Sequence, residues 1–261
     1  MSYAFTMDDL LQQIILLIVS LAANLLSAMA GGGAGLLQLP ALIFLGLPFS
    51  IALATHKIAT VALGVGATIK HSKANNIELR FAVLMLIAGI PGVVLGANII
   101  LEIPEHLAKI ALGLLTMGLG IYSYLKKTLG HEFEAKHRDG WGMSIGAAGL
   151  FFLGVFNGSL TSGTGMFVTM WLITWFGFDY KRATAYTMIL VGMFWNGTGA
   201  ATLTLLAPVQ WSWLPMLLLG SIAGGYWGAH VALKYGNPFI KRIFECVTVF
   251  VGVSLLVQAL A

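Results

Sequence analysis

The sequence predicts an all-α polytopic membrane protein, and three observations support this fold class. The chain is 58% hydrophobic and only 9% charged, whereas about 25% of the residues of a soluble domain are charged. Apolar segments separated by short polar turns fill most of its 261 residues. Glycine-rich runs at 31–35 and 161–165 interrupt the apolar sequence at the same point of each half. A chain with so little polar surface is expected to span a bilayer as helices, which satisfy their own backbone groups.

Ten apolar segments are expected, five in each half. In chain order they cover residues 8–30, 34–47, 50–69, 80–100, 105–125, 141–157, 163–177, 181–206, 211–233 and 238–260. A helix needs about 20 apolar residues to cross the roughly 30 Å hydrocarbon layer. The second and seventh segments reach only about 21 and 23 Å at 1.5 Å per residue. We therefore expect them to form hairpins with the segments before them, either re-entrant or fully spanning, with glycine-rich tips.

Such glycine tips leave backbone N–H groups without helical partners. In lipid these groups must find a partner, and the N-terminus of a helix favours an anion. Paired interrupted segments in corresponding positions of two halves indicate the binding site of a transporter. The tip residues that we predict to bind solute are Gly33, Ala34, Gly35, Gly163, Thr164 and Gly165.

The basic residues indicate which loops share a side of the membrane. If the polar loop at 126–140 is cytoplasmic, the turns at 70–80, 178–182 and 234–242 lie on the same side. Together these four regions hold all but two of the 14 Lys and Arg residues. The pattern follows the positive-inside rule, so all four are predicted to be cytoplasmic.

The two halves resemble each other in their glycines. The run at 33–35 aligns with the run at 163–165, and the GxxxG motif that begins at Gly92 matches the one that begins at Gly224. Glycines spaced by four residues let helices approach closely, so both GxxxG motifs are interpreted as packing sites.

Five segments per half is an odd number, so the second half is expected to enter the membrane from the opposite side. We predict two inverted-topology repeats, at 1–126 and 141–261, joined by a cytoplasmic linker loop at 127–140. Each repeat would contain a glycine-broken short helical hairpin followed by three full transmembrane helices.

Lys57 lies inside the third segment, about 12 Å from its start. A lysine at this depth costs at least about 2.5 kcal/mol on insertion scales, and the segment contains no Asp or Glu. Its side chain either meets an anionic ligand in the interior or snorkels to the outer surface. We predict that it belongs to the substrate site or its pathway and keep snorkelling as the alternative.

His56 precedes Lys57, and adjacent helical side chains point about 100° apart, so both cannot face one spot equally. His56 is either a proton carrier or a hydrogen-bonded core residue. We include it in the predicted substrate site and name it for proton coupling. Sodium held by carbonyl groups would leave no trace in the sequence, so the coupling ion stays open between proton and sodium.

Hydroxyl and amide side chains gather around both glycine breaks. Gln38 follows the first tip, and Asn157 and Ser162 flank the second. Each would donate a hydrogen bond either to an oxyanion or to another helix, and we include all three in the predicted site. Other polar side chains around the breaks are Asn24, Ser27, Ser159, Thr161, Thr164 and Thr169, and the eighth segment adds Tyr186, Thr187, Asn196 and Thr198.

Several motifs resemble those of the TauE/SafE sulfite exporter family, over nearly the whole chain. They are the glycine-rich first hairpin with Leu39-Pro40-Ala41-Leu42, the stretch Ala54-Thr55-His56-Lys57, and Gly163-Thr164-Gly165 with Phe178-Asp179-Tyr180-Lys181-Arg182-Ala183-Thr184-Ala185. The resemblance implies a bacterial inner-membrane transporter of sulfite, organosulfonates or related small organic anions. Many members are more glycine-rich than this chain at 161–165, and we interpret the extra hydroxyls here as substrate contacts.

We therefore expect a secondary transporter that moves a small sulfur-containing oxyanion, sulfite or an organosulfonate, by alternating access. The alternative is an anion channel, or a transporter of another small organic anion such as a carboxylate. The chain has no P-loop, which excludes ATP-driven pumping by this chain. It is not expected to be an enzyme, because its spans lack a Ser/His or paired-Asp arrangement.

The expected partners are a small anionic solute and membrane lipids. The net charge of +4 is attributed to the cytoplasmic loops, so no nucleic acid is expected. The single cysteine, Cys246, excludes an internal disulfide, and no metal or other cofactor is expected. The sequence is compatible with a homo-oligomer.

Overall fold

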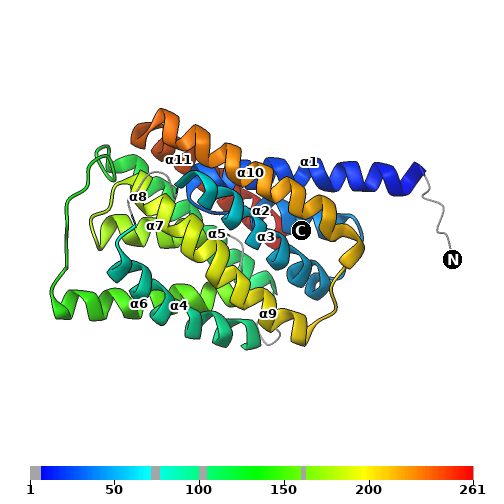
Figure 1. Cartoon of the computed structure of the whole chain (residues 1–261), viewed down its shortest axis with the longest axis horizontal. Coiled ribbons are helices and arrows are strands. Elements are labelled where there is room, and N and C mark those ends of the chain that lie inside the picture. Colours follow the sequence, from blue (N-terminus) through cyan, green and yellow to red (C-terminus); the bar gives the residue numbers. More distant parts are fainter. Residues whose placement is uncertain (1–6, 72–76, 100–104, 160–162, 261) are drawn as a thin grey trace.

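The computed structural model describes residues 7–71, 77–99, 105–159 and 163–260, and all the regular structure within these ranges is helical. Long helices lie broadly along the long axis of the molecule (Figure 1). Six of the described helices are long and apolar enough to cross a membrane. The predicted all-α class is therefore confirmed.

Each predicted segment corresponds to helical structure. The first half contains α1 (Met7–Ala30), α2 (Gly35–Phe44), α3 (Phe49–His71), α4 (Leu79–Ile99) and α5 (Glu105–Leu125). The second half contains α6 (Gly140–Ser159), α7 (Thr164–Thr174), α8 (Tyr180–Tyr186), η3 (Thr187–Trp195), α9 (Asn196–Leu206), η4 (Trp211–Trp213), α10 (Leu214–Tyr235) and α11 (Asn237–Leu260). The eighth segment is a continuous run of α8, the π-helix η3 and α9.

The helices α2 and α7 are short, with 10 and 11 residues. At 1.5 Å per residue each is about 15 to 17 Å long, which is about half of the roughly 30 Å hydrocarbon layer. Each packs against the long helix that precedes it, α2 against α1 and α7 against α6. Neither short helix crosses a bilayer by itself.

Glycines bring helices of the two halves into close contact. The helix α1 packs along α10, and α4 packs along α6. A Cβ added at Gly224 would lie 2.7 Å from Leu21 O on α1, and one added at Gly92 would clash with Phe151 O on α6. Both GxxxG motifs therefore lie at helix contacts, where small residues let the backbones approach.

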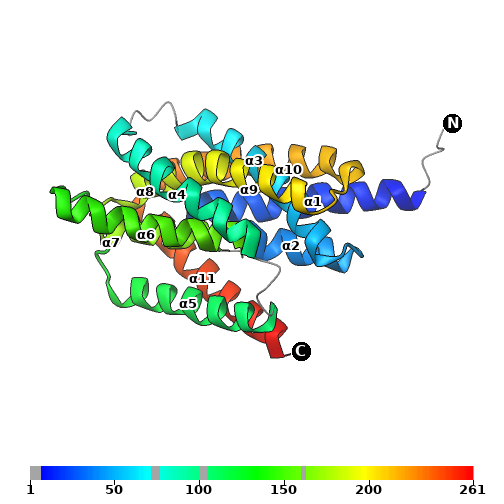
Figure 2. The same cartoon turned by 90° about the horizontal axis from the view of Figure 1, so that it is seen from below.

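The helices α5 and α11 form a pair of their own. They pack along each other, with Gly113 against Gly252, and Figure 2 shows them on one side of the remaining helices. A polar cluster connects this pair to α8. In it Lys241 bonds to Glu245 and Ser123, and Ser123 Oγ lies 2.9 Å from the hydroxyl oxygen of Tyr180.

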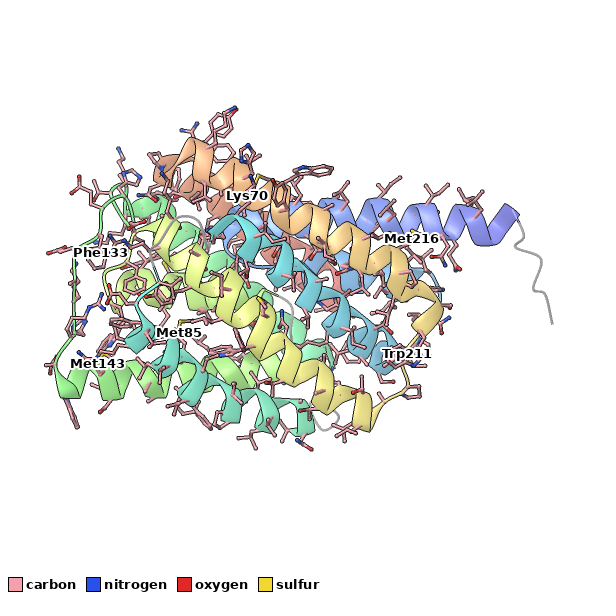
Figure 3. The ribbon with its side chains drawn as sticks, viewed as in Figure 1. Lys70, Met85, Phe133, Met143, Trp211 and Met216 are labelled. Atoms are coloured by element: carbon pink, nitrogen blue, oxygen red, sulfur yellow. The ribbon has the colours of Figure 1, made fainter. Side chains whose placement is uncertain are left out.

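The loop between the halves folds over the end of α7. Glu134 N donates to Gly177 O at 2.9 Å, and Arg138 Nη2 donates to Phe176 O at 3.0 Å. Figure 3 shows Phe133 of this loop at one end of the molecule and Trp211 at the opposite end. Large apolar side chains cover the helix surface between these ends, as expected for contact with lipid.

Candidate solute-binding site between the two halves

The two glycine-rich tips meet in the interior of the molecule. A Cβ added at Gly32 would lie 2.6 Å from the Cα atom of Gly165, so the contact leaves no room for a side chain. The hydroxyl of Thr169 on α7 donates to Gly31 O at 2.9 Å and connects the tips. The two interrupted segments thus reach a common point.

Backbone conformation explains why glycine occupies the first tip. Gly31, Gly32 and Gly33 have φ angles of 80°, 140° and 106°, which L-residues with side chains rarely adopt. The helix α2 begins directly after this turn. The N–H groups of Gly33 and Ala34 have no acceptor among the described residues. The tip therefore presents bare donors at a helix N-terminus.

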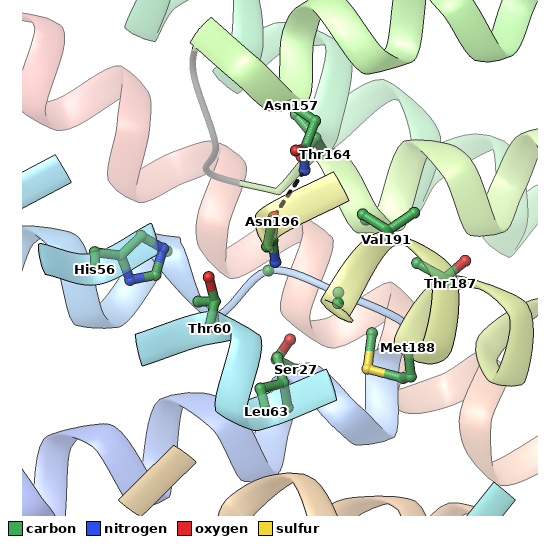
Figure 4. A pocket seen from close by; sticks show the side chains of 16 residues that line it. Ser27, His56, Thr60, Leu63, Asn157, Thr164, Thr187, Met188, Val191 and Asn196 are labelled. Atoms are coloured by element: carbon green, nitrogen blue, oxygen red, sulfur yellow. Dashed lines mark hydrogen bonds between the residues drawn. The ribbon is translucent and has the colours of Figure 1, made fainter. Parts of the chain in front are cut away.

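A buried cavity of about 30 Å³ lies against both tips (Figure 4). One water needs about 10–15 Å³, so the cavity has room for a water or a small ion. The first half lines it with Ser27, Gly32, Gly33, Ala34, Gly35, His56, Thr60 and Leu63, and the second half with Asn157, Thr164, Gly165, Thr187, Met188, Val191, Gly192 and Asn196. No residue in this lining carries a carboxylate.

Lys57 is fully buried and bridges the two halves from just behind the cavity wall. Its ammonium donates to Asn157 O at 2.7 Å, to Asn157 Oδ1 at 2.9 Å and to Asn196 Oδ1 at 3.1 Å. Three protons thus meet three oxygens, and no described carboxylate forms an ion pair with Lys57. The snorkelling alternative is therefore wrong. Asn157 lies in the last turn of α6, where a positive charge also offsets the negative end of the helix dipole.

This bridge fixes the orientation of Asn196. Its Oδ1 accepts from Lys57 and lies 3.3 Å from Asn157 Nδ2. The amide nitrogen of Asn196 must then point the other way, and it has no acceptor among the described residues. Because Asn196 lines the cavity (Figure 4), the lysine behind the wall turns a donor toward the cavity.

Two further side chains on the wall have a polar atom without a partner among the described residues. His56 is fully buried, and its Nδ1 lies 3.0 Å from Gln38 Oε1, while its Nε2 has no hydrogen bond. Ser27 is 2% exposed, and its hydroxyl also has no hydrogen bond. Buried polar groups are normally hydrogen-bonded, so these atoms indicate a place for a solute or water.

The wall opposite His56 is formed by the π-helix η3, which contributes Thr187, Met188, Val191 and Gly192. π-helical turns are rare and occur frequently at functional sites. Thr187 Oγ1 lies 2.9 Å from Thr169 Oγ1, the group that holds Gly31. The π-helix is therefore connected to both tips.

Most of the predicted site residues come together in the structure. Those that line the cavity are Gly33, Ala34, Gly35, His56, Asn157, Thr164 and Gly165. Three others do not line it: Gln38 lies behind His56, Lys57 lies behind the two asparagines, and Gly163 precedes α7 with a φ of 78°. Ser162 lies outside the described residues.

Other lining residues were absent from the predicted site. In the sequence, Ser27 is one of several polar residues near the first tip, Thr187 and Asn196 are two of several in the eighth segment, and nothing sets them apart. Thr60, Leu63, Met188, Val191 and Gly192 also line the cavity. A π-helical turn has no sequence signature comparable to the glycine breaks, so this wall could not be predicted.

The sequence is similar to known proteins over most of its length. The profile of the family described as sulfite exporter TauE/SafE matches residues 16–255. The chain belongs to this family. A "probable membrane transporter protein" of Haemophilus influenzae is 29% identical over 87% of this chain and 88% of its own length. "Probable membrane transporter protein YfcA" of Escherichia coli K12 is 26% identical over 93% of this chain and 88% of its own length. No solved structure matches.

Family and relatives together establish the general activity. This TauE/SafE protein is a multi-pass membrane transporter and not an enzyme. A transporter requires a solute, and the cavity between the tips is lined by residues of both halves.

Proposed function

We propose that this protein is a secondary transporter that moves a small sulfur-containing oxyanion, sulfite or a small organosulfonate, across the bacterial inner membrane by alternating access. The observation that carries the proposal is the cavity between the two tips, with hydrogen-bond donors from both halves and no carboxylate in its lining. The name of the family supports sulfite in particular.

The chemistry of the wall favours an anion. The N–H groups of Gly33 and Ala34 and the amide nitrogen of Asn196 are donors that have no acceptor among the described residues. The N-termini of α2 and α7 both lie at the cavity, and helix N-termini carry partial positive charge. Lys57 adds a full positive charge behind the wall. Preorganised donors of this kind bind an oxyanion well in a site without bulk water.

The size of the cavity favours a small solute. At about 30 Å³ it accommodates a water or a small ion, and a larger organosulfonate requires the walls to move apart. Because each half supplies about half of the lining, a rocking movement of one half against the other would open the cavity. This is the geometry that alternating access requires.

We further propose that the halves at 1–126 and 141–261 are inverted repeats joined by the cytoplasmic linker at 127–140. In such a repeat α1 corresponds to α6, and α4 corresponds to α10. The packing supports this correspondence, because α1 packs on α10 and α6 packs on α4. The helices α5 and α11 are the last helices of the two halves and correspond to each other, and they also pack together. The basic loops at 70–80 and 178–182 and the loop at 234–242 would then share the cytoplasmic side with the linker.

Transport of radiolabelled sulfite into proteoliposomes tests the proposal. We expect saturable uptake that unlabelled internal sulfite accelerates, because a carrier exchanges solute through one site. Small sulfonates should compete with sulfite better than carboxylates do. Uptake without saturation or acceleration would favour the anion channel. Stronger competition by carboxylates would favour a transporter of another small organic anion. Absence of any sulfite flux above that of protein-free liposomes would contradict the proposal.

A further inference from the structure

We infer that the cavity binds its anion together with one proton, held between His56 Nε2 and an oxygen of the anion. The inference rests on the proposed function and adds the chemical form of the bound solute. It follows from the direction of a buried chain of hydrogen bonds that ends at the cavity.

The chain begins at a backbone carbonyl, which can only accept. Ser20 Oγ lies 2.6 Å from Leu217 O and must donate its proton there. Ser20 Oγ therefore accepts from Gln38, whose Nε2 lies 3.1 Å away. With its nitrogen committed to Ser20, Gln38 presents Oε1 to His56 Nδ1 at 3.0 Å. The oxygen accepts, so Nδ1 carries the proton.

The direction of these hydrogen bonds determines whether Nε2 of His56 is a donor or an acceptor at the cavity. In a neutral imidazole only one nitrogen carries a proton, so Nε2 presents a lone pair. That atom is buried and has no hydrogen-bond partner among the described residues, and His56 lines the cavity. A lone pair repels the oxygen of an anion. An oxyanion can therefore sit against Nε2 only if a proton lies between them, on the ring or on the ligand.

Few charged groups surround His56 in the part of the chain that the structure describes. Lys57, its neighbour on α3, is the charged group that acts on it. The described side chains of α1, α2, η3 and α9 include no titratable group. The titratable side chains of α10 are Tyr226, His230, Lys234 and Tyr235. They follow Gly225, which contacts Leu63, and so they lie toward the end of α3 that is distant from His56. The helix α8 also packs near that distant end of α3.

Charge balance also favours one proton per bound anion. Burying an unbalanced charge in a medium of low dielectric constant is costly. Sulfite without its protons carries two negative charges. Lys57 supplies one positive charge behind the wall, and one proton at His56 supplies the second, so the loaded cavity is neutral. The proton enters from water with the anion and leaves with it, and no covalent bond forms.

Calorimetric titration of the purified protein with sulfite tests this. The titrations are made in alkaline buffer, where free sulfite has lost both protons, and in two buffers of different ionisation enthalpy. The wild type should take up about one proton per bound sulfite. The variant His56→Gln places a permanent N–H donor near the position of Nε2, so it should take up about one proton fewer per bound sulfite than the wild type. The variant His230→Gln is the matched control and should behave as the wild type.

The outcomes separate the inference from the proposed function. Sulfite binding by the wild type without proton uptake would overturn the inference alone. Unchanged uptake in a folded His56→Gln protein would overturn it as well. If that variant does not fold, the wild-type titration decides by itself. Absence of sulfite binding by the wild type would overturn the proposed function and the inference with it.

Discussion

Lys57 acts on the cavity through its neighbours. Its three protons meet oxygens of Asn157 and Asn196, and this arrangement turns the amide nitrogen of Asn196 toward the cavity. The lysine also joins α3 of the first half to α6 and α9 of the second. One side chain thus supplies positive charge, orients a donor and connects the halves.

Replacing Lys57 by Met should impair both stability and transport. The change removes the three hydrogen bonds that the Lys57 ammonium donates to buried oxygens of Asn157 and Asn196, and a hydrogen bond that involves a charged group contributes about 1.5–3 kcal/mol. We expect a lower midpoint of thermal unfolding in detergent and loss of sulfite flux in proteoliposomes. Lys70→Met, on the same helix, is the control and should retain transport. A Lys57→Met protein with wild-type melting and flux would exclude this role.

Ser27→Ala separates binding from folding. The hydroxyl has no hydrogen-bond partner among the described residues, so its removal should not lower the unfolding midpoint. If it donates to the anion, the loss of one hydrogen bond to a charged group should weaken sulfite binding about 12- to 140-fold. Calorimetry measures the affinity, and Ser144→Ala on the exposed face of α6 should leave it unchanged. Equal affinities for all three proteins would remove Ser27 from the site.

The sequence is sufficient to predict the helical segments and the two glycine-rich tips. Hydropathy predicted all ten segments because each helix must bury apolar residues in lipid, and the glycine runs predicted both tips because a reversal at positive φ requires glycine there. The partners of Lys57 could not be predicted, since Asn157 and Asn196 lie far from it in sequence. The π-helix η3 was also missed, because its register depends on packing against α3, where Gly192 meets Gly64.

Gly32→Ala tests the contact between the tips. The new Cβ would lie 2.6 Å from the backbone of Gly165 at a φ of 140°. A side chain in a strained region of this kind costs about 1–3 kcal/mol, and the clash adds to this cost. We expect a lower unfolding midpoint and loss of sulfite uptake. Gly197→Ala, beside Asn196 but facing open space, should preserve both, and a fully active Gly32→Ala protein would show that the tips do not touch.

At the scale of the whole molecule, the cavity lies where the two halves meet, and neither half encloses it alone. The helix pairs α1 with α10 and α4 with α6 each combine one helix of each half. A relative movement of the halves would therefore open the cavity and shift these glycine-lined contacts at the same time. This coupling provides a physical basis for alternating access.

The orientation of the chain can be measured by cysteine labelling. In a Cys246→Ala background, Lys127→Cys lies in the linker loop and Ser212→Cys lies in η4, and both positions are exposed. An impermeant maleimide should label Ser212→Cys in spheroplasts, and Lys127→Cys only after the membrane is permeabilised. The reverse pattern would invert the proposed topology, and labelling of both from outside would contradict the odd number of crossings between them.

The central claim is that one anion rests between the two tips. Crystals grown with selenite, the selenium analogue of sulfite, test it most directly, because selenium gives an anomalous signal that the protein lacks. We predict one strong peak in the cavity, at a position from which the selenite oxygens reach the backbone N–H groups of Gly33 and Ala34 and the side chains of Ser27, His56 and Asn196. Separated tips, or selenite bound elsewhere with this cavity empty, would contradict the account.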